Sequence, residues 1–569
     1  MAELPRNEAL AEQFDLLADL MELDGAEYFR IGAYRKAAAR IRDTPSAVAQ
    51  LALDGKAKQL QGIGKTIEGK IVEIVDDGEI HALTKRKAVV PAEVAVFMRL
   101  PGLGPKTARR IWQELGITTV DALKAAAEGG ELRGRAGIGA GTEQKIAAAL
   151  ALPQAAAGPR RALLGTTLPK LRAVVDVLRE HPASVEVSLA GSARRMRETV
   201  RDLDIIATAT DAPTLVEFFC SQPWVVDVAA KGGTKATVVS HDGSRFDLRV
   251  VPPESYGNLL QHFTGSKNHN VALREDAVRR GLSVSEYSVT DVSSGEEHRF
   301  AREEDVYRFL GYAWIPPELR EDGGELAAAR KDALPKLVEL GDLRGDLHTH
   351  TTWSDGKDTL EDMVEAARAR GYAYYAICDH AQRLRGDLLH RQSEAIDALA
   401  ERVAPLRLLK GIEVNIRPDG SLDVDDKELA TRDWVVASVH SRFDHDPTER
   451  VCAAMENPYV DCIGHPTNRR IGNRAPAPID LEQIVEKALE TGTFLELNSQ
   501  PDRLDLSDVH ARAAREAGLK LVIDSDGHQI GALDYVELGV GQARRAWLTA
   551  DDVVNTRTWK QIEKLRKKR

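Results

Sequence analysis

The chain has 569 residues, several times the roughly 100–200 residues of an ordinary domain, and its 43% apolar and 29% charged residues are typical of soluble globular proteins. No apolar run approaches the ~18 residues of a membrane helix, and the N-terminal MAELPRNEAL lacks the pattern of a signal peptide. The four cysteines form no C-x-x-C pair, so we expect a cytoplasmic protein without disulfides.

The net charge of −11 is unevenly distributed. Residues 301–569 hold 38 basic and 49 acidic residues, whereas residues 1–300 hold 39 of each. Within the first part, residues 51–200 hold 23 basic and 16 acidic residues. A positive region of this kind is typical of proteins that contact phosphates, so the acidic total does not exclude a nucleic-acid ligand.

In chain order, residues 1–150 have apolar side chains at helical spacing, which predicts a set of short helices. Residues 151–160 are rich in alanine, proline and glycine and are typical of a linker. Strand-like alternation runs from Val185 to about Val251. Beyond about residue 342, apolar runs alternate with helical patterns, so the pattern predicts a multidomain α/β protein.

Three twelve-residue segments align: LQGIGKTIEGKI, LPGLGPKTARRI and RAGIGAGTEQKI, which begin at Leu60, Leu100 and Arg135. Each has Gly-x-Gly and, at the eleventh position, a basic residue. They resemble the helix-hairpin-helix motif, in which glycines let backbone N–H groups approach a DNA phosphate without reading the base sequence. One Gly-x-Gly is more often an ordinary turn, but three in register favour DNA binding. The candidate DNA-binding residues are Gly62, Gly64, Lys70, Gly102 and Gly104.

Three aspartates are predicted to share one face of a sheet. Asp202 and Asp204 are two apart on one strand-like segment, and Asp247 lies on another whose alternate residues are apolar. A bare D-x-D is more often a solvated strand face. Three carboxylates on one face would repel one another unless two divalent cations neutralised them.

An anion site is predicted beside these aspartates. A strand-like run ends just before Gly191 and Ser192, where backbone N–H groups at a helix N-terminus can bind phosphate. Arg195 follows three residues later on the same helix face. A phosphate site next to a carboxylate cluster is the arrangement that nucleotidyl transfer requires.

The segments GSARRMRETVRDLD, SRFDLRVVP and HFTGSKNHNVALR resemble the palm and thumb of family X DNA polymerases, of which polymerase beta is one, over residues 5–320. The resemblance implies that Asp202, Asp204 and Asp247 are catalytic and hold Mg²⁺ or Mn²⁺, with Asp247 assisting deprotonation of the primer end. It implies a nucleotide site made of Gly191, Ser192, Arg195, His262, Phe263, Gly265 and Asn270.

Within that site, the resemblance places Ser192 and Arg195 on the β and γ phosphates, Phe263 and Gly265 against the sugar, and Asn270 on the base, with Arg274 in the template minor groove. His262 stands where the vertebrate enzyme has tyrosine, which leaves discrimination against ribonucleotides open. Met196 and Arg201 replace usual glycines, and Arg201 could perturb metal binding. Arg249 has two interpretations, a functional role or simple pairing with a metal aspartate.

A lyase activity is a further hypothesis. Residues 33–38 resemble a segment of the family's lyase domain, and Lys70 lies at the position of its Schiff-base lysine, which needs a lowered pKa. Lys70, Arg110 and Lys145 are equivalent in the three repeats, however, so phosphate contact also explains a basic residue there.

Seven apolar runs after residue 343 end in polar clusters: DLHTH, YYAICDH, LLKGIEVN, DWVVASVH, DCIGHP, FLELNS and LVIDSDGH. In parallel α/β folds the C-terminal ends of the strands meet at one edge. One histidine there is more often structural, but a set of nine candidate ligands favours a metal centre. The nine are His348, His350, Asp355, His380, Glu413, His440, His465, Asp526 and His528.

This set resembles the PHP (polymerase and histidinol phosphatase) domain, a distorted (β/α)7 barrel. The resemblance implies up to three Mn²⁺ or Zn²⁺ ions, a 3′→5′ exonuclease, and an endonuclease at abasic sites. Arg469, Arg470 and Arg503 could contact DNA phosphates or simply be solvated.

We therefore expect a polymerase that fills short gaps during DNA repair, a monomer whose partners are gapped or nicked double-stranded DNA and dNTPs, with no membrane. Two alternatives remain: an untemplated nucleotidyltransferase, and a DNA-end scaffold with an inactive PHP domain.

The expected domains are a lyase-like DNA-binding domain (1–85), a helix-hairpin-helix domain (86–158), a nucleotidyltransferase palm (159–258), a thumb (259–322), a linker (323–340) and a PHP domain (341–569).

Overall fold

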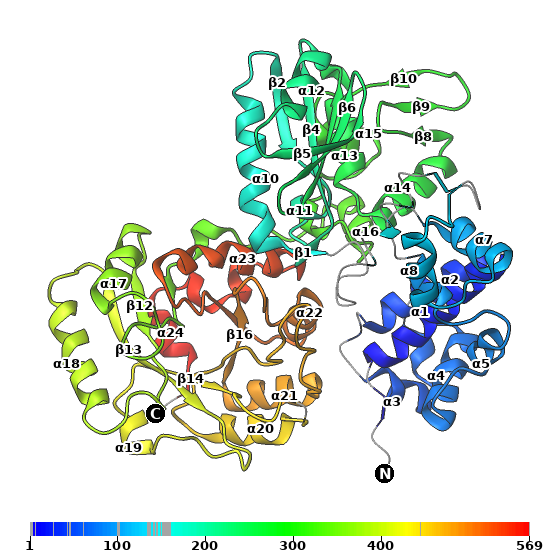
Figure 1. Cartoon of the computed structure of the whole chain (residues 1–569). Coiled ribbons are helices and arrows are strands. Elements are labelled where there is room, and N and C mark those ends of the chain that lie inside the picture. The colour runs from blue at the N-terminus through cyan, green and yellow to red at the C-terminus, as the bar shows by residue number, and fades with distance from the viewer. Residues whose placement is uncertain are drawn as a thin grey trace. The chain divides into compact units, whose positions relative to one another are not determined.

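The chain divides into two units, Met1–Arg161 and Ala162–Arg569, in a computed structural model of the protein (Figure 1). The structure describes residues 4–5, 7–26, 28–42, 44, 47–60, 62–98, 103–133, 138–139, 143, 146–147, 150, 161–443 and 445–567. Over this part of the chain, no helix is both long enough and apolar enough to cross a membrane.

The N-terminal unit is helical, as its periodicity predicts, and one apolar core runs from Leu10 to Leu150. Helices α4 and α7 each begin directly after a Gly-x-Gly, with Gly64 and Gly104 as their N-caps. The elements are α1 (Asn7–Asp24), α2 (Tyr28–Arg42), α3 (Val48–Leu53), η1 (Ala57–Gln59), α4 (Lys65–Asp77), α5 (His81–Lys87), α6 (Val94–Phe97), α7 (Pro105–Leu115) and α8 (Val120–Glu128).

The second unit begins with a five-stranded sheet of order β2-β4-β7-β6-β5, in which only the β4–β7 pair is parallel. Leu203 and Ile205 of β4 and Phe246, Leu248 and Val250 of β7 are buried, as the alternation predicts. The elements are β1 (Ala162–Leu163), α10 (Leu164–Arg179), β2 (Ser184–Leu189), α11 (Gly191–Arg194), β3 (Thr199–Val200), β4 (Asp202–Ala209), α12 (Ala212–Cys220), β5 (Val225–Lys231), β6 (Lys235–Ser240) and β7 (Arg245–Val251).

A helical segment with a small sheet, of order β10-β9-β8, follows. Its core also contains Ala329 and Leu337, so the segment expected to be a linker with a helix packs against this core, and its helix is α16. The elements are η3 (Pro253–Ser255), α13 (Tyr256–Thr264), α14 (Lys267–Arg279), β8 (Leu282–Val284), β9 (Val289–Asp291), β10 (Glu297–His298), α15 (Glu303–Phe309), η4 (Pro317–Leu319) and α16 (Glu325–Arg330).

The remainder is a seven-stranded parallel sheet whose strands lie in sequence order, β11 to β17. A parallel bridge between Thr349 and Gly527 links the segments after its first and last strands, so the barrel is nearly closed. The strands are β11 (Gly345–Asp346), β12 (Tyr374–Ile377), β13 (Arg407–Asn415), β14 (Trp434–Ser438), β15 (Cys462–Ile463), β16 (Phe494–Asn498) and β17 (Leu521–Asp524).

Helices cover the outside of this barrel (Figure 1). The helical elements of this part of the chain are η5 (Leu340–Asp342), α17 (Leu360–Ala369), α18 (Leu388–Ala400), α19 (Asp426–Leu429), α20 (Thr448–Glu456), α21 (Leu481–Thr491), α22 (Asp508–Glu516), η6 (Ile530–Tyr535), α23 (Val536–Arg545), η7 (Ala550–Asp552), η8 (Val554–Thr556) and α24 (Trp559–Leu565).

The barrel packs directly against the five-stranded sheet domain. Leu504 and Leu538 of the barrel domain belong to the core of that sheet domain. A Cβ placed on Gly165 of α10 would lie 2.6 Å from the Pro501 side chain and 2.7 Å from that of Leu538, so only glycine fits there. The two parts therefore form one packed body, which sequence patterns alone did not predict.

Candidate active sites

The three aspartates predicted to share one face lie at the start of the parallel β4–β7 pair. The register pairs Asp204 with Asp247 and Asp202 with Arg245. Because alternate residues of a strand share a face, this register places the three carboxylates on one face of the sheet, near enough for the charges of Asp247 and Asp202 to act on Asp204. Burial, followed by the charges of Asp247 and Asp202, raises the pKa of Asp204 to about 7. Such a cluster has a high affinity for cations.

Arginines partly balance this charge in the structure. Arg201 Nε lies 2.9 Å from Asp202 Oδ2, so the arginine that replaces a usual glycine pairs with one of the three predicted metal ligands. Arg245 Nε lies 3.9 Å from Asp202 Oδ1 and 3.6 Å from Asp247 Oδ2. Arg249 instead lies over the Phe263 ring, 4.4 Å from its centroid.

The predicted phosphate residues surround the short helix α11. Gly191 is buried and has φ +62°, and Ser192 is half-buried beside it. Arg195 caps the C-terminal end of the helix, and its Nη1 donates to the carbonyl of Thr264. A Cβ on Gly265 would lie 3.3 Å from Arg195 Nη1, so the residues predicted for the phosphates and for the sugar meet at one place.

The other predicted nucleotide residues are joined by hydrogen bonds. Asn270 Nδ2 donates to the carbonyl of His262 at 2.7 Å, and Asn270 Oδ1 accepts from Gln261 at 2.9 Å. Arg274 Nη2 lies 3.0 Å from His262 Nδ1. Burial, and then the charge of Arg274, lower the pKa of His262, so the ring is neutral near pH 7 and can accept this bond.

Helices α4 and α7 of the N-terminal unit lie within two of the predicted repeats. Gly62 has φ +85°, a conformation that favours glycine, and no described residue lies within 4 Å of its would-be Cβ. Lys70 Nζ lies 6.0 Å from the centroid of the Tyr34 ring. Gly102 and Lys145 lie outside the described residues, as does most of the third repeat. The lyase role of Lys70 stays a prediction.

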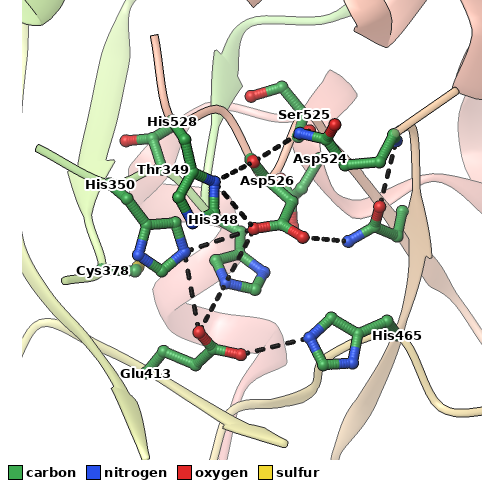
Figure 2. Close-up of polar contacts among 12 residues, drawn as sticks. His348, Thr349, His350, Cys378, Glu413, His465, Asp524, Ser525, Asp526 and His528 are labelled. Carbon is green, nitrogen blue, oxygen red and sulfur yellow. Dashed lines mark hydrogen bonds and ion pairs between the residues drawn. The ribbon is translucent and has the colours of Figure 1, made fainter. Parts of the chain in front are cut away.

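The nine side chains predicted as metal ligands converge at the C-terminal ends of the barrel strands. Figure 2 shows the Glu413 carboxylate between the rings of His348, His350 and His465. Glu413 oxygens lie 3.5, 3.6 and 3.3 Å from Nε2 of these three rings. Three groups have ligand atoms within 4.8 Å of one another: His350, Asp355, His380 and His528; His348, His350 and Glu413; and His380, Glu413 and His440.

The buried atoms of this cluster fit a metal. Nε2 of His348, Nε2 of His350 and Oε1 of Glu413 are buried and have no hydrogen-bond partner among the described residues, which is costly unless a cation binds them. Burial, and then the charge of His528, lower the pKa of His350 to about 3; burial, and then the charge of Arg503, do the same for His465. Neutral rings have the free lone pair that a metal requires.

Three positioning residues were missed by the sequence analysis. Glu496 Oε1 lies 2.7 Å from His348 Nδ1, and Asn415 Oδ1 lies 2.6 Å from His440 Nδ1. Asn498 donates to Glu496 at 3.2 Å and to Asp526 at 3.0 Å. Such partners orient metal-binding rings. Their signal was present, since all three lie in the polar clusters that end the strands.

The metal cluster opens into a cavity of about 470 Å³. Lys357, Arg470 and Arg503 line it together with seven of the nine predicted ligands, all except His348 and His350. Arg503 is largely buried and donates to Asn468 Oδ1 at 3.1 Å, and Arg470 pairs with Asp502 at 2.5 Å. A cationic wall beside a metal cluster suits a phosphodiester.

These features define a class of protein: a nucleotidyltransferase sheet with a helical thumb, on one chain with a metal-binding parallel barrel. Known families match in the same order. Their models cover residues 5–80 (helix-hairpin-helix domain), 95–151 (SAM-like helix-hairpin-helix tandem), 259–321 (DNA polymerase beta thumb) and 346–528 (PHP domain).

The DNA polymerase/3′-5′ exonuclease PolX of Bacillus subtilis (strain 168) is 40% identical over 562 residues, which are 96% of this chain and 97% of that protein. The chain therefore belongs to the PolX family, and it is a family X DNA polymerase with a PHP domain. The barrel alone resembles smaller proteins: a probable phosphatase of Acetivibrio thermocellus is 32% identical over 206 residues, 34% of this chain and 83% of that protein. A probable phosphatase of Thermoanaerobacter sp. (strain X514) is 31% identical over 238 residues, covering 39% and 95%.

Proposed function

We propose that this polymerase fills short gaps in double-stranded DNA and that its PHP domain removes nucleotides from the primer 3′ end. The observation that supports this is the presence on one chain of two separate sets of candidate metal-ligand side chains. One is all carboxylate, at the β4–β7 pair, and the other is rich in imidazole, at the end of the barrel. Acidic oxygen sites suit Mg²⁺ or Mn²⁺, whereas imidazole favours transition metals such as Mn²⁺ and Zn²⁺.

In the proposed polymerase site, Asp202, Asp204 and Asp247 hold the divalent cations. When bound, these cations supply the charge that acidifies the primer 3′-hydroxyl and stabilises the leaving pyrophosphate. Asp247 accepts a hydrogen bond from Thr237, which orients its carboxylate next to Asp204. Ser192 and Arg195 bind the phosphates, and Phe263, Gly265 and Asn270 hold the sugar and base.

In the proposed nuclease site, the nine side chains from His348 to His528 hold up to three Mn²⁺ or Zn²⁺ ions. Such ions supply a hydroxide and polarise the phosphodiester. Arg503 and Arg470 bind the phosphodiester from the cavity wall. Glu496 keeps the His348 ring in one orientation, because its carboxylate accepts the proton on Nδ1 and leaves Nε2 free to bind metal.

We further propose the division of labour expected from the sequence. The unit before residue 159 binds DNA through Gly62, Gly64 and Gly104, residues 159–322 polymerise, and residues 341–569 degrade. Gly62 and Gly64 precede α4, and Gly104 precedes α7, so the first backbone N–H groups of each helix are placed to bind a phosphate. Arg274 contacts the template.

One gel assay on a labelled primer in gapped DNA tests both sites, with Mg²⁺ and with Mn²⁺. Asp202→Ala should abolish extension and leave degradation, because it removes charge stabilisation of the transition state at one site only. His348→Ala with His350→Ala should abolish degradation and leave extension nearly intact. Extension by Asp202→Ala at the wild-type rate would refute the polymerase site, and undiminished degradation by the double variant would refute the nuclease site.

A further inference from the structure

Helix α23 of the PHP domain lies against the turn that follows α11 in the polymerase domain. A Cβ on Gly541 would lie 2.6 Å from Cε of Met196, so the helix approaches this turn as closely as glycine allows. Gln542, which is buried, donates from Nε2 to the carbonyl of Met196 at 3.0 Å. The turn beside the proposed phosphate site thus packs directly against helix α23 of the PHP domain.

Arg545, the last residue of α23, reaches into this site. Its side chain is buried, and its Nη1 donates to the carbonyl of Arg195 at 2.9 Å and to Oε1 of Glu321 at 3.0 Å. Its Nε and Nη2 donate to Asp508 at 2.9 and 2.6 Å. Arg195 is the C-cap of the one-turn helix α11, so Arg545 binds the backbone directly after that helix.

Glu321 stands between two guanidinium groups. Its Oε1 also accepts from Nε of Arg195 at 3.0 Å, so one carboxylate oxygen is shared by Arg195 and Arg545. Burial opposes the charged form of Glu321, but the charges of Arg545 and Arg195 prevail and lower its pKa, so it is ionised. A carboxylate and a triphosphate compete for the same arginine. Because Arg545 also pairs with Glu321, the attraction between Glu321 and Arg195 is weaker.

We propose that Arg545 is a positioning residue of the polymerase site: by sharing Glu321, it makes Arg195 available to the nucleotide triphosphate. The proposal rests on the proposed function, since it takes Arg195 as a phosphate ligand. The nucleotide affinity of the polymerase then depends on a side chain of the nuclease domain. Arg545 acts through Glu321 and Arg195 and does not itself touch the substrate.

The test uses the full chain, Mg²⁺ and a one-nucleotide gap, and measures KM for the dNTP and kcat separately. Arg545→Met is combined with Asp508→Asn, so that no buried carboxylate loses its partner. This double variant should have a KM for the dNTP about tenfold higher than the wild type and a nearly unchanged kcat, because only ground-state binding of the nucleotide is lost. Glu321→Gln alone should lower the KM for the dNTP. When Glu321→Gln is added to the double variant, the KM of the resulting triple variant should equal that of Glu321→Gln alone.

Arg544→Met is the matched control. Arg544 is the neighbouring residue on α23 and pairs with Glu318 at 2.7 Å and with the carbonyl of Val338 at 3.1 Å, away from Arg195. Its truncation should leave the dNTP KM unchanged. Exonuclease activity and the melting temperature establish that each variant is folded.

Three results would overturn the inference. The first is an unchanged KM for the dNTP in the folded double variant Arg545→Met with Asp508→Asn, and the second is a raised KM in that double variant that adding Glu321→Gln does not restore. The third is a raised or unchanged KM in the single variant Glu321→Gln. The last result decides the matter if the Arg545 pair does not fold. Arg195→Ala separates this inference from its premise. If Arg195→Ala leaves KM unchanged, the proposed role of Arg195 fails. If Arg195→Ala raises KM while the Arg545→Met and Asp508→Asn double variant leaves KM unchanged, only the proposed role of Arg545 fails.

Discussion

Replacing Gly191 with alanine tests how closely α11 and the metal-site carboxylates are fitted together. The added Cβ would lie 2.0 Å from Oδ2 of Asp204, about 1 Å closer than the 3.0 Å below which real Cβ atoms essentially never approach an atom. Asp204 or the α11 backbone must therefore move by about 1 Å, and a misplacement of that size at a reacting centre costs on the order of 100-fold in rate. The backbone at φ +62° adds a strain of roughly 1–2 kcal/mol.

Gly243→Ala provides the control. Gly243 lies in the exposed turn between β6 and β7 of the same sheet, has φ +79°, and has nothing within 4 Å of its would-be Cβ. Both variants should lose similar stability, on the order of 1–2 kcal/mol by denaturant titration. Single-nucleotide extension should fall about 100-fold in Gly191→Ala alone. Equal extension rates in the two variants would refute the reasoning, as would a wild-type rate in Gly191→Ala.

Three further predictions follow from the charges and hydrogen bonds. Glu496→Gln should weaken Mn²⁺ binding to the full chain about 10–100-fold, because Nδ1 of His348 loses its anionic partner, and a metal titration with unchanged affinity would contradict this. Glu303→Gln should destabilise the second unit by roughly 3–5 kcal/mol in denaturant titration, because the buried Arg320 then loses the carboxylate 2.6 Å away; a loss within error of zero argues against it. Affinity for gapped DNA should fall steeply between low and moderate salt because of the basic residues in 51–200, and a flat salt response would exclude phosphate contacts as the main source of binding.

Local patterns in the sequence were sufficient to predict the strands that carry the candidate catalytic and metal-binding side chains. The alternation around Asp204 and Asp247 predicted two strands with inward Leu248 and outward carboxylates, and the structure has both. Seven apolar runs predicted seven parallel strands, because strands buried on both faces are continuously apolar. The nine candidate ligands were recognisable because metal-binding side chains follow strands at the same edge of a barrel.

Only the tertiary structure decided what those side chains contact. The pairing of Glu496 with His348 joins residues 148 positions apart, and that of Arg545 with Arg195 joins residues 350 positions apart. Periodicity reports which face of an element is buried, but it does not report which other element covers that face. The domains expected on either side of a linker therefore turned out to share a packed boundary, and an arginine from the C-terminal barrel part of the chain lies against the proposed nucleotide site. The sequence determined the strands, the carboxylates and the ligand types, whereas packing determined how the two sites are joined.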